Sequence, residues 1–191
     1  MDLGLKGLKA IVTAGTKGIG QAIPQTLAAE GAHIAICARN ADEVAASVAK
    51  LQTSGVTAFG RAVDVADGMA VAAWVADAAT AMGGIDIAVI NVSALAIAAH
   101  EAAWQSGFEV DMMGTVRLIN AAMPYLGKSK HAAIVTISSV SGREIDFASG
   151  PYGAFKADIV RYTQGLAYHL AGKGIQANSV SPGYTYFAGG V

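Results

Sequence analysis

Tyr152 and Lys156 are the residues of this chain whose types and spacing most directly suggest chemistry, and Ser139 lies a short distance upstream. On an α-helix, positions i and i+4 lie on the same face, so the ammonium group can approach the phenol without help from another element. A free tyrosine titrates near pKa ~10, and a neighbouring cation favours the phenolate. The pair therefore predicts a proton donor and its tuning charge. Alone it is weak evidence, because one such spacing can arise by chance in a chain with 6 tyrosines.

The composition indicates a folded domain with an extensive core. Of 191 residues, 53% are hydrophobic and only 14% are charged. These proportions exclude a disordered chain and leave surface for subunit contacts. Because this length suits one domain, we expect residues 1–191 to form a single domain.

Several classes of protein are excluded by the charge and by the spacing of special residues. The longest charge-free apolar run, Ile87 to Ala99, is too short to cross a membrane, and the N-terminus lacks a signal pattern, so we expect a cytoplasmic protein. The net charge is −1 without a basic run, which argues against nucleic-acid binding. Cys37 has no partner for an internal disulfide, and the histidines lack metal-ligand spacing, so no metal is expected. A small-molecule substrate is the better expectation.

Apolar, β-branched runs alternate with alanine-rich helical stretches along the whole chain. This alternation predicts an α/β fold of the Rossmann type, a doubly wound parallel sheet in three layers. The expected strands are Ala10–Thr13, His33–Cys37, Thr57–Val63, Asp86–Asn91, Ala132–Ser138 and Ile175–Val180. The expected helices are Gly18–Glu30, Ala41–Thr53, Asp67–Met82, Glu101–Leu126 and Pro151–Ala171.

A glycine-rich loop joins the first expected strand to the first expected helix. A helix N-terminus offers unpaired N–H groups and the positive end of a dipole, and glycines let a pyrophosphate come close to the backbone. We therefore expect a dinucleotide here; a turn that only reverses the chain is the alternative. The expected ligands are Gly15, Thr16, Lys17, Gly18, Ile19 and Gly20.

The end of the second strand indicates which dinucleotide is bound. NAD-binding sites commonly have an acidic residue there for the ribose hydroxyls, whereas this chain has Arg39 and no acid between Cys37 and Asn40. Arg39 and Lys17 could together neutralise a 2′-phosphate, so NADP is favoured over NAD. Alternatively, both are ordinary solvated charges.

Taken in chain order, these motifs resemble the short-chain dehydrogenase/reductase family. The resemblance runs nearly end to end and includes the strand Ile134–Ser139, the pair Tyr152 and Lys156, and the segment Asn178–Gly183. It implies that Tyr152 donates a proton to a substrate carbonyl, that Ser139 hydrogen-bonds the same oxygen, and that Lys156 binds the nicotinamide ribose and makes the tyrosine more acidic. Further cofactor contacts are implied for Asp64, Val65, Asn91, Pro182, Gly183 and Thr185.

The sequence departs from the family pattern at several positions. Ala14 replaces the first glycine of the cofactor loop, and Ile90 and Ser93 replace two residues of the turn around Asn91. Asp111 stands where the family usually has an asparagine that holds a water of the proton relay, so a catalytic role is expected for it. The aspartate could hold that water or pair directly with Lys156.

The resemblance also implies features of the substrate pocket, the assembly and the C-terminus. The family usually continues well past Gly183, so the C-terminal part of the fold is expected to be missing. Helices over 101–126 and 151–171 would pair with their mates in a homodimer or homotetramer. The expected pocket, apolar with one possible anion contact at Arg143, is bordered by Ser93, Ala94, Leu95, Ser139, Ser141, Arg143, Ile145, Tyr152 and Tyr184 to Phe187.

These observations support one leading function and two alternatives. The leading hypothesis is an NADP(H)-dependent oxidoreductase that interconverts a ketone or aldehyde with an alcohol, and an oxoacyl thioester, a cyclic ketone or a steroid-like alcohol would suit the pocket. The first alternative is a non-catalytic NADP(H)-binding regulator or sensor with the same fold. The second is a Rossmann-type methyltransferase, which shares the glycine loop but has no use for Tyr152 and Lys156.

Overall fold

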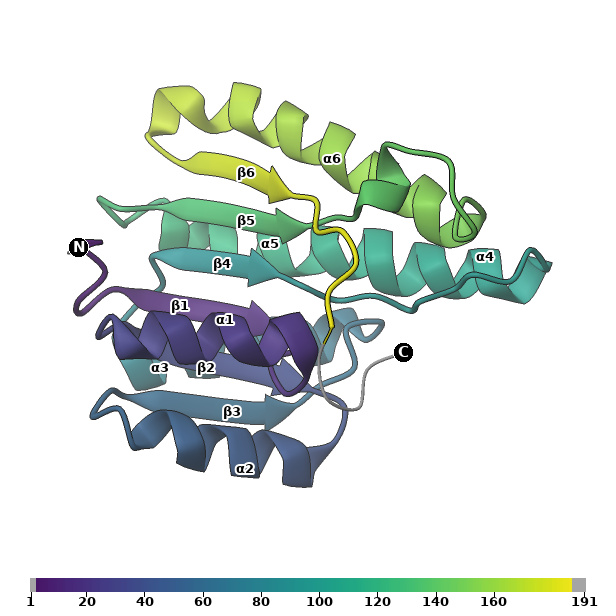
Figure 1. Cartoon of the computed structure of the whole chain (residues 1–191). Helices are drawn as coiled ribbons and strands as arrows, with labels where there is room; N and C mark the ends of the chain where they lie inside the picture. Colours follow the sequence, from purple (N-terminus) through teal and green to yellow (C-terminus); the bar gives the residue numbers. More distant parts are fainter. Residues whose placement is uncertain (1–2, 187–191) are drawn as a thin grey trace.

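The computed structural model describes residues 3–186 and contains one six-stranded parallel sheet. The strand order is β3-β2-β1-β4-β5-β6, the order of the doubly wound Rossmann fold. All five pairings are parallel, so the carboxyl ends of the strands meet at one edge (Figure 1). The strands are β1 (Lys9–Thr13), β2 (His33–Ala38), β3 (Ala58–Ala62), β4 (Ile87–Ile90), β5 (Ala133–Ile137) and β6 (Gln176–Val180).

Helices cover both faces of the sheet and bury its apolar side chains. In Figure 1, α1 (Gly18–Ala29) and α2 (Ala41–Gln52) lie in front of the sheet, and α3 (Gly68–Met82) and α5 (Gly114–Leu126) lie behind it. Side chains of α6 (Pro151–Leu170) pack in the same apolar cluster as those of α3 and α5, around the fully buried Trp74. Two apolar layers enclose the sheet, which confirms the predicted three-layer α/β fold.

The expected helix Glu101–Leu126 is the one element that the structure corrects. It consists of α4 (Glu101–Gly107), a π-helical segment (Phe108–Met113, labelled η1) and α5. Short π-helical segments inside helices are rare and are frequent at functional sites. This segment contains Asp111, whose backbone carbonyl accepts a hydrogen bond of 2.6 Å from the Thr115 hydroxyl.

Two short 3-10 helices complete the described structure. The first, Val140–Gly142, follows β5 and lies directly against α6, since a Cβ atom on Gly142 would come within 2.7 Å of the Lys156 backbone. The second, Ala171–Lys173, follows α6 and leads into β6. The close approach at Gly142 holds the carboxyl end of β5 next to the first turns of α6, where Tyr152 and Lys156 lie.

Candidate active site

A cleft of about 840 Å³ opens at the carboxyl edge of the sheet, where β1 and β4 are neighbours and the strand order reverses. This reversal is the usual position of a ligand in a doubly wound sheet. The cleft brings together seven of the residues expected to bind cofactor or substrate: Thr16, Lys17, Arg39, Asp64, Val65, Asn91 and Ser93. Its volume is in the range typical of a cofactor site.

The loop after β1 keeps a tight turn although Ala14 occupies a glycine position. Ala14 adopts φ +50, in the left-handed region that glycine enters without cost. A Cβ atom on Gly20 would collide with the Ala14 carbonyl oxygen and the Asn91 side chain, so only glycine fits there. Gly15 also lies close to β2, because a Cβ atom added there would be 2.7 Å from a methyl carbon of Ile36.

The N-terminus of α1 is suited to a phosphate group. The helix begins at Gly18, and its N-cap residue Lys17 makes no side-chain capping hydrogen bond. No acidic side chain lies in its first turn. Because the first N–H groups of a helix lack partners within the helix and carry partial positive charge, they favour an anion. These residues therefore fit a dinucleotide pyrophosphate.

Sequence reasoning missed Glu43, which lies among the charges of this cleft. Its carboxylate forms an ion pair of 2.8 Å with Lys17 and accepts a hydrogen bond of 3.2 Å from the Thr16 hydroxyl. The hydrogen bond from Lys17 holds the pKa of Glu43 below its ordinary value. Asn40 caps α2, which places Glu43 in the first turn of that helix. The spacing of Asn40 and Glu43 is close to a capping box, and this signal could have located the glutamate.

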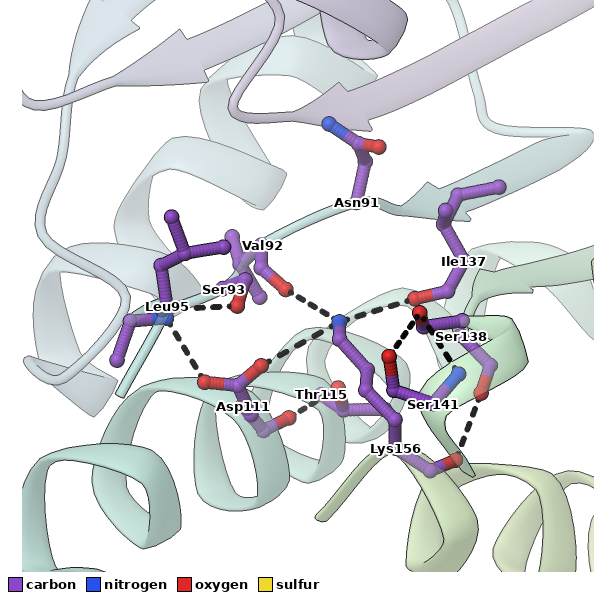
Figure 2. Close-up of polar contacts among 12 residues, drawn as sticks. Asn91, Val92, Ser93, Leu95, Asp111, Thr115, Ile137, Ser138, Ser141 and Lys156 are labelled. Atoms are coloured by element: carbon purple, nitrogen blue, oxygen red, sulfur yellow. Dashed lines mark hydrogen bonds and ion pairs between the residues drawn. The ribbon is translucent and has the colours of Figure 1, made fainter. Parts of the chain in front are cut away.

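Lys156 is the centre of a buried polar cluster in Figure 2. Its ammonium nitrogen lies 3.3 Å from Val92 O, 3.1 Å from Ile137 O and 3.3 Å from Asp111 Oδ1. The side chains of Lys156 and Asp111 are only 3% and 2% exposed. Burial lowers the pKa of Lys156, and the charge of Asp111 opposes that shift. Of the two possibilities for Asp111, direct pairing with the lysine is therefore the one observed.

Asp111 also holds the loop that follows β4. Its second carboxylate oxygen accepts a hydrogen bond of 2.8 Å from the Ala94 N–H. The next residue, Leu95, has φ +50, and its N–H donates to the Ser93 hydroxyl at 3.0 Å. One carboxylate thus joins the π-helical segment, the lysine of α6 and the loop at the mouth of the cleft, as Figure 2 shows.

Tyr152 lies beside the lysine on the first turn of α6. The ammonium nitrogen of Lys156 is 5.6 Å from the centre of the tyrosine ring. The ring is half-buried, and the Tyr152 N–H donates a hydrogen bond of 3.1 Å to the Ala96 carbonyl. The predicted i, i+4 proximity is therefore present, and the loop after β4 is tied to the start of α6.

Ser139 is held at the end of β5 by bonds to its neighbours. The Ser138 hydroxyl donates to the Lys156 carbonyl at 2.7 Å, which ties the strand end to α6. The Ser139 hydroxyl oxygen accepts from the Ser141 N–H at 3.2 Å and lies 3.3 Å from the Ser141 hydroxyl. Ser141 in turn donates to Asp146 at 2.6 Å, and this hydrogen bond is the main reason that the pKa of Asp146 is lowered. Sequence reasoning missed Asp146.

The segment after β6 returns toward the cofactor loop. The Val140 N–H donates to the Pro182 carbonyl at 3.0 Å, and a Cβ atom on Gly183 would contact Val140. Figure 1 shows this yellow segment crossing the carboxyl ends of the strands toward α1. A second hollow of about 450 Å³ beside α1 is bordered by Thr185 together with the first two residues of that helix, Gly18 and Ile19.

Some expected pocket residues do not line either hollow. Arg143 is exposed, and Tyr184 is 89% exposed, so neither is brought to the cleft in the described residues. Leu95 and Ile145 are exposed as well, whereas Ala94 lines the cleft. Phe187 lies outside the described residues. The substrate roles of Arg143 and Tyr184 remain predictions.

Metal-dependent chemistry and thiol chemistry have little support in residues 3–186. No group of three or more His, Cys, Asp or Glu side chains there could hold a metal ion. Burial raises the pKa of Cys37 to about 12, so its thiol stays protonated at the edge of the cleft.

Over residues 3–186, no helix has the length and apolar character needed to span a membrane. The cytoplasmic location stays a prediction.

Comparison with known proteins identifies the family. The profile of the short chain dehydrogenase family matches residues 8–188. The chain belongs to the short-chain dehydrogenase family. This membership excludes the methyltransferase alternative, because the matched family consists of dehydrogenases and reductases.

Three relatives illustrate the range of the family around this chain. The isoepoxydon dehydrogenase patN of Penicillium expansum is 37% identical over 197 residues, covering 100% of this chain and 75% of that protein. The NAD(+) 2-dehydro-3-deoxy-L-rhamnonate dehydrogenase of Sphingomonas sp. SKA58 is 31% identical, covering 92% and 71%. A short chain dehydrogenase from Burkholderia cenocepacia J2315, solved in complex with NADP, has a TM-score of 0.88 at 34% identity, covering 94% and 75%.

Proposed function

We propose that this short-chain dehydrogenase is an NADP(H)-dependent oxidoreductase that interconverts a ketone or aldehyde with an alcohol, working as one dinucleotide-binding and catalytic domain. The observation that carries the proposal is the position of Lys156 beside the Tyr152 ring, 5.6 Å from its centre, at the end of β5 where Ser139 lies. A phenol with an adjacent buried cation suits proton transfer to a carbonyl oxygen.

The proposed reduction needs one proton and one hydride. When bound, the nicotinamide supplies the hydride to the carbonyl carbon. The Tyr152 hydroxyl donates its proton to the carbonyl oxygen, which becomes the hydroxyl of the alcohol. Ser139 donates a hydrogen bond to the same oxygen and stabilises the charge that develops on it. In the oxidative direction the tyrosine accepts the proton instead.

Lys156 and Asp111 tune and position this proton donor. The ammonium group lies 5.6 Å from the centre of the Tyr152 ring and would bind the ribose hydroxyls of the cofactor. Its charge is partly balanced by Asp111 at 3.3 Å. We assign Asp111 as a positioning residue, since it acts through Lys156 and through the loop at Ala94.

The cofactor proposal rests on the charges of the cleft. Arg39 lines the cleft at the end of β2, and no acidic residue stands beside it between Cys37 and Asn40. A guanidinium group and an ammonium group are suited to a 2′-phosphate. The relative from Burkholderia that contains NADP supports this choice, and the NAD(+) dehydrogenase from Sphingomonas argues for a direct comparison of both cofactors. Arg39→Ala is expected to weaken NADPH binding more than NADH binding.

The substrate and the assembly remain broader proposals. Two of the relatives are named for different compounds, isoepoxydon and 2-dehydro-3-deoxy-L-rhamnonate, so only a small carbonyl compound is proposed as the substrate class. A homodimer or homotetramer through residues 101–126 and 151–171 is supported by the half-exposed rings of Trp104 and Phe108, which pack against Phe155 of α6. Sedimentation that gives an active monomer would contradict this assembly.

The test of the proposed function is NADPH oxidation with a panel of ketones and aldehydes, using the wild type and Tyr152→Phe. The wild type is expected to reduce at least one member, and Tyr152→Phe is expected to lose about 100-fold or more in rate, the usual contribution of a positioned acid. Equal rates would remove Tyr152 from the mechanism. Cofactor binding by both proteins, measured by fluorescence, shows whether the variant still folds.

A non-catalytic NADP(H)-binding regulator is the second candidate. The observation that favours it is that the Lys156 ammonium group already donates hydrogen bonds to the Val92 and Ile137 carbonyls and lies 3.3 Å from Asp111 Oδ1 in an ion pair. These three partners compete with the ribose for the ammonium group. Tight NADPH binding without turnover of any carbonyl in the panel would support the regulator and contradict the enzyme.

A further inference from the structure

The ion pair between Glu43 and Lys17 occupies the part of the cleft where the adenosine 2′-phosphate of NADP is proposed to lie. One carboxylate oxygen is 2.8 Å from the Lys17 ammonium group, and the other accepts from the Thr16 hydroxyl at 3.2 Å. All three residues line the cleft with Arg39. The glutamate therefore belongs to the phosphate-binding end of the site, although no motif of the sequence assigns it there.

The charges around this position work against a phosphate. A phosphate monoester carries nearly two negative charges at neutral pH. Lys17 and Arg39 attract it, but Glu43 already neutralises the lysine and would repel the incoming group. Asp64, which follows β3, adds a second carboxylate to the lining, and Asp42 lies beside Glu43 on the exposed side of α2. These carboxylates would repel a phosphate at this range, although salt weakens the repulsion between exposed groups.

We propose that Glu43 is a determinant of cofactor specificity that weakens the binding of phosphorylated dinucleotide by competing for Lys17. The inference rests on the proposed function, in which the cleft binds a nicotinamide dinucleotide. Without the 2′-phosphate, NADH places no additional charge near the glutamate. Glu43 is thus expected to narrow the difference in affinity between NADPH and NADH, so that the protein uses both.

The structure also indicates that Glu43 can be replaced without loss of α2. The start of that helix is capped by Asn40, whose side-chain oxygen accepts from the N–H groups of Asp42 and Glu43 at 2.9 and 3.1 Å. These bonds use the backbone of Glu43 and not its carboxylate. Glu43→Gln keeps the size of the side chain and removes only the charge, so the fold is expected to persist.

The experiment measures binding and needs no substrate. Dissociation constants of NADPH and NADH, and of the fragments 2′,5′-ADP and 5′-AMP, are measured by fluorescence or calorimetry for the wild type and Glu43→Gln. The variant is expected to bind NADPH and 2′,5′-ADP roughly tenfold more tightly, a change of the size that one nearby charge produces. Binding of NADH and 5′-AMP is expected to stay within about twofold, and the gain should shrink at high salt.

Asp42→Asn is the matched control, because it removes the same charge from the first turn of α2 without touching Lys17. It is expected to change NADPH binding by less than about twofold. The inference is overturned if Glu43→Gln weakens NADPH binding, changes NADPH and NADH equally, or acts no more strongly than Asp42→Asn.

Failure of the proposed function gives a different result. If the wild type prefers NADH but Glu43→Gln still tightens only NADPH, the cofactor choice is wrong and the role of Glu43 stands. If neither dinucleotide binds to either protein, the proposed function fails and the inference fails with it.

Discussion

Asp111 Oδ1 lies 3.3 Å from the ammonium nitrogen of Lys156, and both side chains are almost completely buried. The pair joins the π-helical segment Phe108–Met113 to α6 at the position where Tyr152 needs a cation. A buried pair of this kind contributes little net stability, because both charges lose their hydration. The pair matters for function, because the negative charge of Asp111 partly cancels the positive charge that Lys156 presents to Tyr152.

Asp111→Asn is therefore expected to shift the pH dependence of the reaction. Without this carboxylate nothing opposes the effect of burial, so the pKa of Lys156 should fall further and the lysine should lose its proton at a lower pH. The basic limb of kcat/KM for alcohol oxidation, above which the lysine has lost its charge, should therefore move down by about one pH unit. A limb that stays in place or moves up contradicts the role assigned to Asp111.

The same pair predicts how stability responds when one partner is removed. Lys156→Met leaves Asp111 buried without its counter-charge, and breaking a buried pair commonly costs about 3–5 kcal/mol. Adding Asp111→Leu removes the stranded charge, so the double variant should recover most of the loss. Urea unfolding of the two single variants and the double variant measures the coupling. Strictly additive effects would mean that the two charges do not interact in the folded protein.

Asp146 is expected to support catalysis from outside the cleft. Its carboxylate accepts from Ser141 at 2.6 Å, and Ser141 is bonded to Ser139. Asp146→Ala removes the acceptor that fixes the Ser141 hydroxyl, and Ser141 then no longer holds Ser139 in position. Because a reacting group is misplaced, kcat should fall roughly tenfold or more while KM changes little. Asp146→Asn, which keeps one acceptor, should restore part of the rate. Glu144→Gln, at an exposed position of the same loop, is the control and should retain nearly full activity.

The lowered pKa of Asp146 also predicts a pH dependence of stability. Because the folded state binds this proton less tightly than the unfolded state, the stabilisation is present above the ordinary aspartate pKa of about 3.9 and is lost as the pH falls toward the lowered value. Ser141→Ala removes the main cause of the shift. The urea midpoint of the wild type should exceed that of Ser141→Ala at pH 7, and the difference should shrink at pH 3. A difference that grows on acidification would contradict this assignment.

The arrangement of the strands and the cleft could be predicted because it depends on local patterns. The alternation of apolar strands and alanine-rich helices determines the sheet, and the glycine loop marks its carboxyl edge. The π-helical segment could not be predicted, because the apolar pattern of the sequence does not distinguish a short π-helical segment from a continuous α-helix.

The ion pairs could not be predicted for a different reason. Glu43 and Lys17 are far apart in the sequence, and each looks like an ordinary solvated charge until α2 and the first loop lie side by side. The sequence draws attention to Asp111, but the choice between a water and the lysine depends on a distance of 3.3 Å, which only the packing of the π-helical segment against α6 determines. Long-range polar contacts follow from the fold and not from local pattern.

Ala14 is expected to limit the stability of the cofactor loop. It has φ +50, and a residue with a Cβ atom in the left-handed region costs about 1–2 kcal/mol. Ala14→Gly should therefore raise the free energy of unfolding by about 1 kcal/mol, less the entropy that glycine gains in the unfolded chain. Ala22→Gly, on the exposed side of α1, is the control and should lower stability, because its conformation is helical. If both variants lose stability equally in urea, Ala14 is not strained.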